Sequence, residues 1–258
     1  VVTGMGLVTP LGCGITTNWN KLISGESGAN KISRFDASRF KCQVACEVPQ
    51  KDDISGAFIA EDWIDKKEIK KIDSFIKFSM AAGEEAFQQS KLNNIEDPLS
   101  FRSGCIIGSG MGGLPGIEET SVSYNNGKKI SPFFITGRII NMSSGYLSIK
   151  YNLKGPNYST VSACASSAHA IGESYRLIQH NQADIMMTGG SEATISPIGI
   201  EGFTACKALS TNFNDKPDRA SRPFDDLRDG FVMGEGSAIL ILEEMEHVMN
   251  RNANILAE

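Results

Sequence analysis

The sequence predicts an α/β fold whose mostly parallel sheet is covered by helices on both faces. Apolar runs of strand length alternate along the chain with segments in which apolar residues recur every three or four positions. This alternation is typical of strands joined by crossover helices. Residues 238–242 are apolar at every position, as a strand buried on both faces requires. With 258 residues, the chain can bury a sizeable core.

Each predicted element follows from a local pattern. The first strand is expected at residues 1–8 and leads through a Thr-Pro-Leu-Gly turn into a helix near 15–24. Helical periodicity is clear at 63–90, where Phe75, Phe78, Ala82 and Ala86 recur at that spacing. Two short helices are expected over 131–152. Single helices are expected from Cys164 to about 180, over 197–205 and from 243 onward. Further strands are expected as a hairpin near 43–48, at 102–108, before Cys164, at 183–188 and at 237–242.

The composition argues against several classes of function. The net charge of −5 at pH 7 lacks the basic footprint of a general nucleic-acid-binding protein. No apolar run is long enough to cross a bilayer. The cysteines lack the paired spacing of metal ligands, so we expect no metal site and reduced thiols in a cytoplasmic protein. They are Cys13, Cys42, Cys46, Cys105, Cys164 and Cys206.

The stretch at 155–170 reads as a short apolar strand, a sharp turn and a helix of small residues. Cys164 lies where the strand becomes the helix, so the first amides of the helix should favour its thiolate. The first two turns carry small residues on every face, which predicts a buried central helix between two layers. Cys164 is therefore expected at the bottom of a pocket. Because most buried cysteines are inert, position alone leaves its role open.

The three histidines offer Cys164 no obvious base. A Cys-His pair requires the two side chains to be in hydrogen-bond contact. His169 follows Cys164 by five residues on the same helix and should point away from it, at about 100° per residue. His180 and His247 lie in polar helix ends. A cysteine hydrolase or a simple acyltransferase would need such a histidine, so we expect acid and base groups outside these 258 residues.

A glycine-rich turn after the second long strand allows two interpretations. Gly108, Gly110 and Gly113 meet the G-x-G-x-x-G spacing of a dinucleotide-binding loop. However, no βαβ unit begins there, and no acidic residue ends a strand about 20 residues further on. The alternative is a glycine turn that lets a long substrate pass close to the backbone.

Four lysines interrupt an otherwise acidic chain at 66–71. Lys66, Lys67, Lys70 and Lys71 would share one face of a helix. This face is either an ordinary solvated surface or a docking patch for an acidic partner.

Taken together, the motifs resemble those of the β-ketoacyl-acyl-carrier-protein synthases, most closely the type II elongating enzyme of fatty-acid synthesis. They occur in family order along the whole chain, at 2–12, 108–113, 130–134, 155–164, 189–192, 208–210 and 222–236. The resemblance implies a thiolase-like fold, of which residues 1–258 would be the N-terminal domain. We expect the chain to be truncated before a C-terminal half that holds two catalytic histidines and a lysine.

The resemblance also implies a reaction. Cys164 would take an acyl chain from acyl-carrier protein, malonyl-carrier protein would lose CO₂, and the resulting carbanion would attack the acyl-cysteine. The product is two carbons longer, and no cofactor is implied. The Cys164 backbone N–H would form one arm of the oxyanion hole. We expect residues 1–258 alone not to condense, and Cys164 itself argues against the alternative of a non-catalytic chain-length factor.

Several binding residues are implied by the same resemblance. Met111 would occupy the gate of the acyl pocket, where the family has a branched aliphatic residue, and Phe203 would line that pocket. Phe134 would line the pocket of the partner subunit in a homodimer. The carrier-protein docking patch would consist of Lys67, Lys70 and Lys71.

Overall fold

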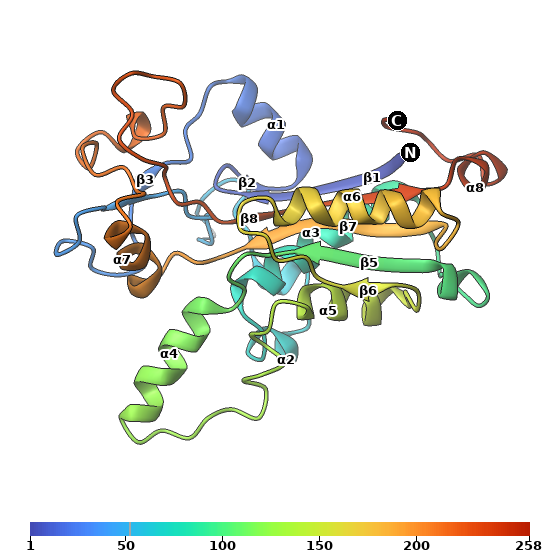
Figure 1. Ribbon diagram of the computed structural model, residues 1–258, viewed down its shortest axis with the longest axis horizontal. Helices are drawn as coiled ribbons and strands as arrows, with labels where there is room; N and C mark the ends of the chain where they lie inside the picture. The colour runs from blue at the N-terminus through green and yellow to red at the C-terminus, as the bar shows by residue number, and fades with distance from the viewer. Residues whose placement is uncertain (52) are drawn as a thin grey trace.

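The computed structural model describes residues 1–51 and 53–258, and its centre is a long twisted sheet (Figure 1). Six strands form this sheet in the order β2-β1-β8-β7-β5-β6. They are β1 (Val2–Thr9), β2 (Gly12–Cys13), β5 (Ser103–Gly108), β6 (Asn157–Tyr158), β7 (Ile185–Glu192) and β8 (Gly236–Glu243). A second, two-stranded sheet pairs β3 (Asn30–Lys31) with β4 (Val44–Ala45). The hairpin expected near 43–48 is therefore wrong, because only β4 lies in that range and its partner strand comes earlier in the chain.

The central sheet is mixed in direction. β5 pairs in parallel with β6 and with β7, whereas β8 is antiparallel to both β1 and β7. β1, β5, β6 and β7 therefore point the same way, as the α/β prediction requires, and β8 lies reversed between β7 and β1. The expected last strand is thus confirmed in position, but its direction makes the sheet less parallel than the sequence predicts.

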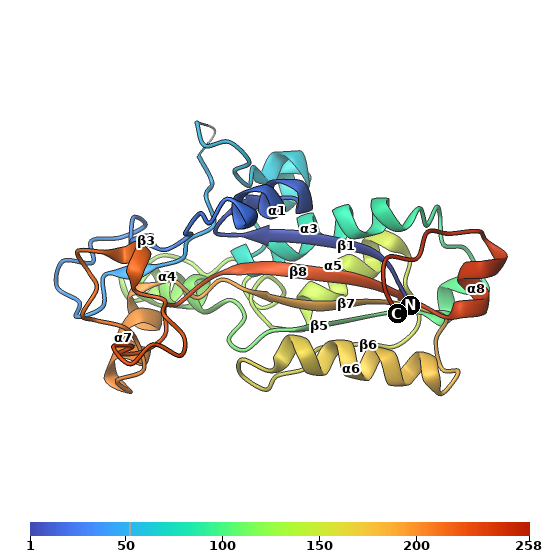
Figure 2. The same cartoon turned by 90° about the horizontal axis from the view of Figure 1, so that it is seen from above.

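Helices cover both faces of the sheet. They are α1 (Ile15–Ile23), α2 (Lys66–Ile69), α3 (Ser74–Ser90), α4 (Leu114–Asn125), α5 (Met142–Tyr151), α6 (Ser166–Gln179), α7 (Pro197–Ala205) and α8 (Met245–Asn250). Short 3₁₀ turns lie at Ala60–Asp62, Leu99–Arg102 and Pro217–Arg219. Figure 2 shows α6 along one face and α3 with α5 along the other. The main core lies under α3 and α5, where Phe75, Phe78 and Leu147 are fully buried.

Two predicted elements differ from the structure. The helical period at 63–90 is broken near Asp73, whose carboxylate accepts from the Ser74 N–H at 2.7 Å and caps α3. Between 131 and 152 one helix forms, α5, and turns occupy the residues before it instead of a second helix. Across the described residues, no helix combines the length and the apolar character needed to span a bilayer.

Two glycines let α6 lie very close to the sheet. A Cβ added to Gly108, the last residue of β5, would lie 2.4 Å from the Ser166 carbonyl oxygen. A Cβ added to Gly190 of β7 would lie 2.6 Å from Cβ of Ser167. Both contacts involve the first residues of α6, so the two strands fix where this helix begins.

Replacing Gly108 with alanine should destabilise the full-length protein by about 1–3 kcal/mol, because the helix start or the strand must move to admit the methyl group. Gly202→Ala is the matched control, since nothing lies within 4 Å of a Cβ there and alanine favours helix α7. Chemical denaturation of the two variants measures the difference. Equal unfolding midpoints would contradict the close contact.

Candidate active site

Cys164 lies in a turn between β6 and α6. The expected strand ends six residues before it, and the helix begins two residues after it. The turn is held by its own backbone: the Ala165 N–H donates to the Ser162 carbonyl and the Ser166 N–H to the Ala163 carbonyl, each at 3.1 Å. No hydrogen bond from the Cys164 N–H is present among the described residues.

The residue before the cysteine has an unusual backbone conformation. Ala163 has a φ of 51°, in the left-handed region that is costly for a residue with a Cβ. Its carbonyl accepts from the Ser166 hydroxyl at 2.7 Å, and the Ser166 oxygen accepts from the Ser162 N–H at 2.9 Å. This Ser166 bridge holds the conformation that presents Cys164.

The prediction that Cys164 is buried is wrong for the described residues. Its side chain is exposed. Helix α6 buries only the side that faces the sheet, where Ser166, Ala170 and Ser174 lie. Ala168, on another side, is exposed. The small residues permit a second covering layer, but the described chain supplies only one.

Cys164 lines a pocket of about 680 Å³. The walls come from the ends of β1, β5 and β7, the start of β8, helix α7 and residues 231–236. This is the edge where the co-directional strands end, the usual position of ligand sites in α/β sheets. Met111 and Phe203 line the same pocket, so the structure brings these two predicted residues together with Cys164. Phe134 is not among the lining residues and lies in the turns that precede α5.

A carboxylate fills the glycine turn after β5. Glu192, the last residue of β7, accepts from the N–H groups of Gly110 at 2.6 Å, Met111 at 3.1 Å and Gly112 at 3.1 Å. It also accepts from the Ser109 hydroxyl at 3.0 Å. Successive N–H groups of this kind make an anion site. Since Glu192 occupies it, the turn has no room for a dinucleotide phosphate.

The glycine turn still lines the pocket of Cys164, which is compatible with the alternative of a substrate passing close to its backbone. Burial raises the pKa of the Glu192 carboxyl above its ordinary value, and its four donors act in the opposite direction.

The same pocket holds a buried carboxylate, Glu235, which the sequence analysis included in the motif at 222–236 without giving it a role. Glu235 forms an ion pair with Arg34 and accepts from the Val48 N–H at 2.8 Å. Burial raises the pKa of the Glu235 carboxyl, against the pull of the Arg34 charge. The two residues are 201 positions apart, so only the glycines beside Glu235 offered a local signal.

The histidines lie as predicted, away from the thiol. His169 Nδ1 is 2.5 Å from the Ser162 hydroxyl and lines a different cavity, and His247 Nδ1 is 2.9 Å from the Glu243 carboxylate. His180 follows the last residue of α6. Over residues 1–51 and 53–258, no histidine lines the Cys164 pocket and no acidic, cysteine or histidine cluster could hold a metal ion.

The prediction of a basic helix face is wrong about the helix but right that basic side chains lie on the surface here. Helix α2 has four residues and ends before Lys70, so the lysines do not share one helical face. Lys67 and Lys70 are exposed. Lys71 is half-buried, with its Nζ 2.5 Å from Glu68 Oε1 and 4.8 Å from the centre of the Phe133 ring.

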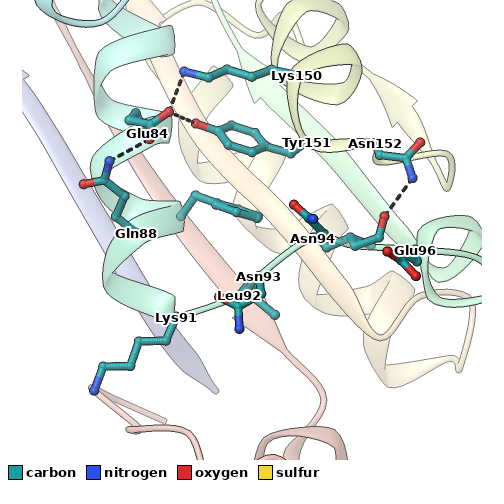
Figure 3. Close-up of a pocket in the computed structure, with 12 residues that line it drawn as sticks. Glu84, Gln88, Lys91, Leu92, Asn93, Asn94, Glu96, Lys150, Tyr151 and Asn152 are labelled. Carbon is teal, nitrogen blue, oxygen red and sulfur yellow. Dashed lines mark hydrogen bonds and ion pairs between the residues drawn. The ribbon is translucent and has the colours of Figure 1, made fainter.

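A larger cavity of about 1170 Å³ lies between the C-terminal ends of α3 and α5 (Figure 3). On one of its walls, Glu84 accepts from Lys150 Nζ and the Tyr151 hydroxyl, both at 2.5 Å, and from Gln88 at 2.7 Å. These interactions pair the carboxylate within the chain. None of the predicted site residues lines this cavity.

Comparison with known proteins identifies the family. Residues 1–247 match the family described as "Beta-ketoacyl synthase, N-terminal domain". The chain therefore belongs to the beta-ketoacyl synthase family. It is 46% identical to 3-oxoacyl-[acyl-carrier-protein] synthase 2 of Rhizobium meliloti (strain 1021), over 100% of this chain and 62% of that relative.

Solved structures agree with this assignment. A beta-ketoacyl synthase from Burkholderia phymatum STM815 superposes with a TM-score of 0.84 and 30% identity, covering 99% of this chain and 61% of the other. A ketosynthase described as bound to the hexaketide, in complex with a type II PKS acyl-carrier protein, gives a TM-score of 0.82 at 28% identity, over 99% of this chain and 60% of the other. The chain thus spans about three fifths of the length of these relatives.

The left-handed residue before the cysteine provides a test of the site. Ala163→Val should slow alkylation of Cys164 by iodoacetamide about tenfold, because a β-branched residue strongly disfavours positive φ and the turn would relax. Ala163→Gly is the control and should react within about twofold of the wild type, since glycine adopts this conformation freely. Peptide mass spectrometry of the full-length protein follows the modification. Equal rates for the valine and glycine variants would count against the turn as the device that presents the thiol.

Proposed function

We propose that the full-length protein is a 3-oxoacyl-[acyl-carrier-protein] synthase that elongates fatty acids by two carbons. The Cys164 sulfur attacks the thioester of an acyl-carrier protein, and the carrier thiol leaves. Malonyl-carrier protein then loses CO₂, and the carbanion that forms attacks the acyl-cysteine carbonyl. The C–S bond breaks, Cys164 is regenerated and the 3-oxoacyl product remains on the carrier. Residues 1–258 form the N-terminal domain, and groups outside them transfer the protons.

The observation that carries this proposal is an exposed thiol on the wall of a pocket large enough for an acyl chain. The Cys164 N–H has no acceptor within the described chain, so it is free to donate to an oxyanion formed at the thioester. The lack of a histidine in this pocket disfavours a cysteine hydrolase built from these residues alone.

The other parts of the proposal concern binding. Met111 and Phe203 line the acyl pocket from one subunit, and Phe134 reaches the pocket of the partner subunit in a homodimer. Acyl-carrier protein docks on Lys67, Lys70 and Lys71. The six free cysteines are compatible with a reducing compartment, and the cytoplasm is the proposed location.

The test of the nucleophile uses a matched pair of cysteines. Incubating the full-length protein with acyl-carrier protein should add one acyl group to the wild type and none to Cys164→Ala, as measured by intact mass. Cys206→Ala is the control, because Cys206 is also exposed and free but does not line the pocket. An adduct that survives in Cys164→Ala would refute the proposal.

Carrier docking is tested by reversing charge. The double variant Lys67→Glu, Lys70→Glu should raise the KM for acyl-carrier protein about tenfold at low salt, with little change in kcat, because the carrier is an acidic partner. Raising the salt concentration should shrink the difference through screening. Lys128→Glu, Lys129→Glu alters two other exposed lysines by the same charge and should leave the KM unchanged. The same rise in both double variants would show a net-charge effect without a docking patch.

A further inference from the structure

The middle of the loop that carries Met111 is held by one side chain, Glu192. The N–H groups of three consecutive residues, Gly110, Met111 and Gly112, all donate to the Glu192 carboxylate. Gly112 also donates to the Ser109 hydroxyl at 3.1 Å, and that hydroxyl donates to Glu192. On either side of these residues, the Ser109 N–H donates to the Thr160 carbonyl at 3.3 Å and the Gly113 N–H to the Arg138 carbonyl at 3.0 Å, so Glu192 holds the segment between two backbone anchors. Removing the carboxylate would leave the Gly110 and Met111 amides without an acceptor among the described residues.

Glu192 is itself firmly placed. It ends β7 and pairs in register with Gly236 of β8, so the sheet fixes its backbone. Its Oε2 lies 3.0 Å from the position that a Cβ on Gly110 would take, which leaves little space between carboxylate and loop. The position of the loop is thus set by the end of a central strand.

We infer that Glu192 is a positioning residue that sets acyl-chain specificity by holding Met111 on the wall of the Cys164 pocket. The inference rests on the proposed function. Glu192 need not touch the substrate, because it acts through the main chain of Met111. Met111 is 45% exposed in the described chain, so contacts of its side chain hold it weakly and the hydrogen bond of its main chain decides where it lies. A methionine has several flexible torsions, which makes this anchor more important.

The chemistry of the contact selects the informative variant. A carboxylate offers acceptors on both oxygens, and here all of them face donors. Glu192→Gln keeps the size but replaces one oxygen with an NH₂ group, which would face N–H or O–H donors. At least one of the hydrogen bonds to residue 192 must then break, and the main chain of Met111 becomes more mobile.

The experiment compares kcat/KM for a short and a long saturated acyl-carrier protein, using the full-length enzyme. Glu192→Gln should change the ratio of the two values by about fivefold, as expected for coupled neighbours. In the Met111→Ala background, the same substitution should change the ratio by less than about twofold. A shift of equal size in both backgrounds would overturn the inference, as would an unchanged ratio in a folded Glu192→Gln enzyme.

Glu243→Gln is the structural control. Glu243 is a fully buried carboxylate at the far end of β8. It accepts a hydrogen bond from Thr3, forms an ion pair with Arg251 and does not line the Cys164 pocket. Its replacement should lower the thermal midpoint without moving the chain-length ratio, and a ratio moved equally would contradict a specific role for Glu192. If Glu192→Gln does not fold, Ser109→Ala removes one donor and should shift the ratio in a smaller but measurable way; no shift would overturn the inference.

A readout that needs no turnover separates this inference from the proposed function. Amide hydrogen exchange at residues 110–112 should be about tenfold faster in Glu192→Gln than in wild type, because these N–H groups lose their acceptor. Unchanged exchange there would overturn the inference even in an active enzyme. A wild type that forms no elongated product would instead contradict the proposed function. The exchange rates would still show whether Glu192 holds the loop.

Discussion

The structure around the thiol depends on the close contact between the start of α6 and the ends of two strands. Gly108 of β5 and Gly190 of β7 have no side chains, so Ser166 and Ser167 can lie directly against the strand backbones. A methyl group at either glycine would push the helix start away from the sheet. The turn that presents Cys164 comes immediately before this helix start. The position of the Cys164 thiol is therefore set by backbone contact between helix and sheet.

Two carboxylates organise the rest of the pocket. Glu192 binds the amides of the glycine turn, and Glu235 binds Arg34 and the Val48 amide from a distant part of the chain. Each acts as an internal anion for donors that would otherwise be left without partners. The role of Glu192 explains why the glycine turn resembles a phosphate-binding loop in sequence without being one: the protein supplies its own carboxylate.

Much of the fold could be predicted from local patterns, whereas contacts between distant residues could not. Helix α7 has the predicted limits, and the main strands lie where apolar runs place them. The direction of β8 depends on the path of the long loop before it, which has no local signal. The exposure of Cys164 was mispredicted because a helix of small residues shows that a second layer can pack, without showing that this chain provides it. Glu192 was recognised only as part of a motif, because its partners lie about 80 positions earlier.

The central claim is that Cys164 carries the acyl chain during elongation, and a pulse and chase tests it most directly. The full-length enzyme is loaded from acyl-carrier protein, malonyl-carrier protein is added, and the mass of the Cys164 peptide is followed together with the product. The account predicts that the acyl group leaves Cys164 at the rate at which 3-oxoacyl-carrier protein appears. Product that forms while the acyl group stays on Cys164, or without its ever being loaded there, would contradict the account.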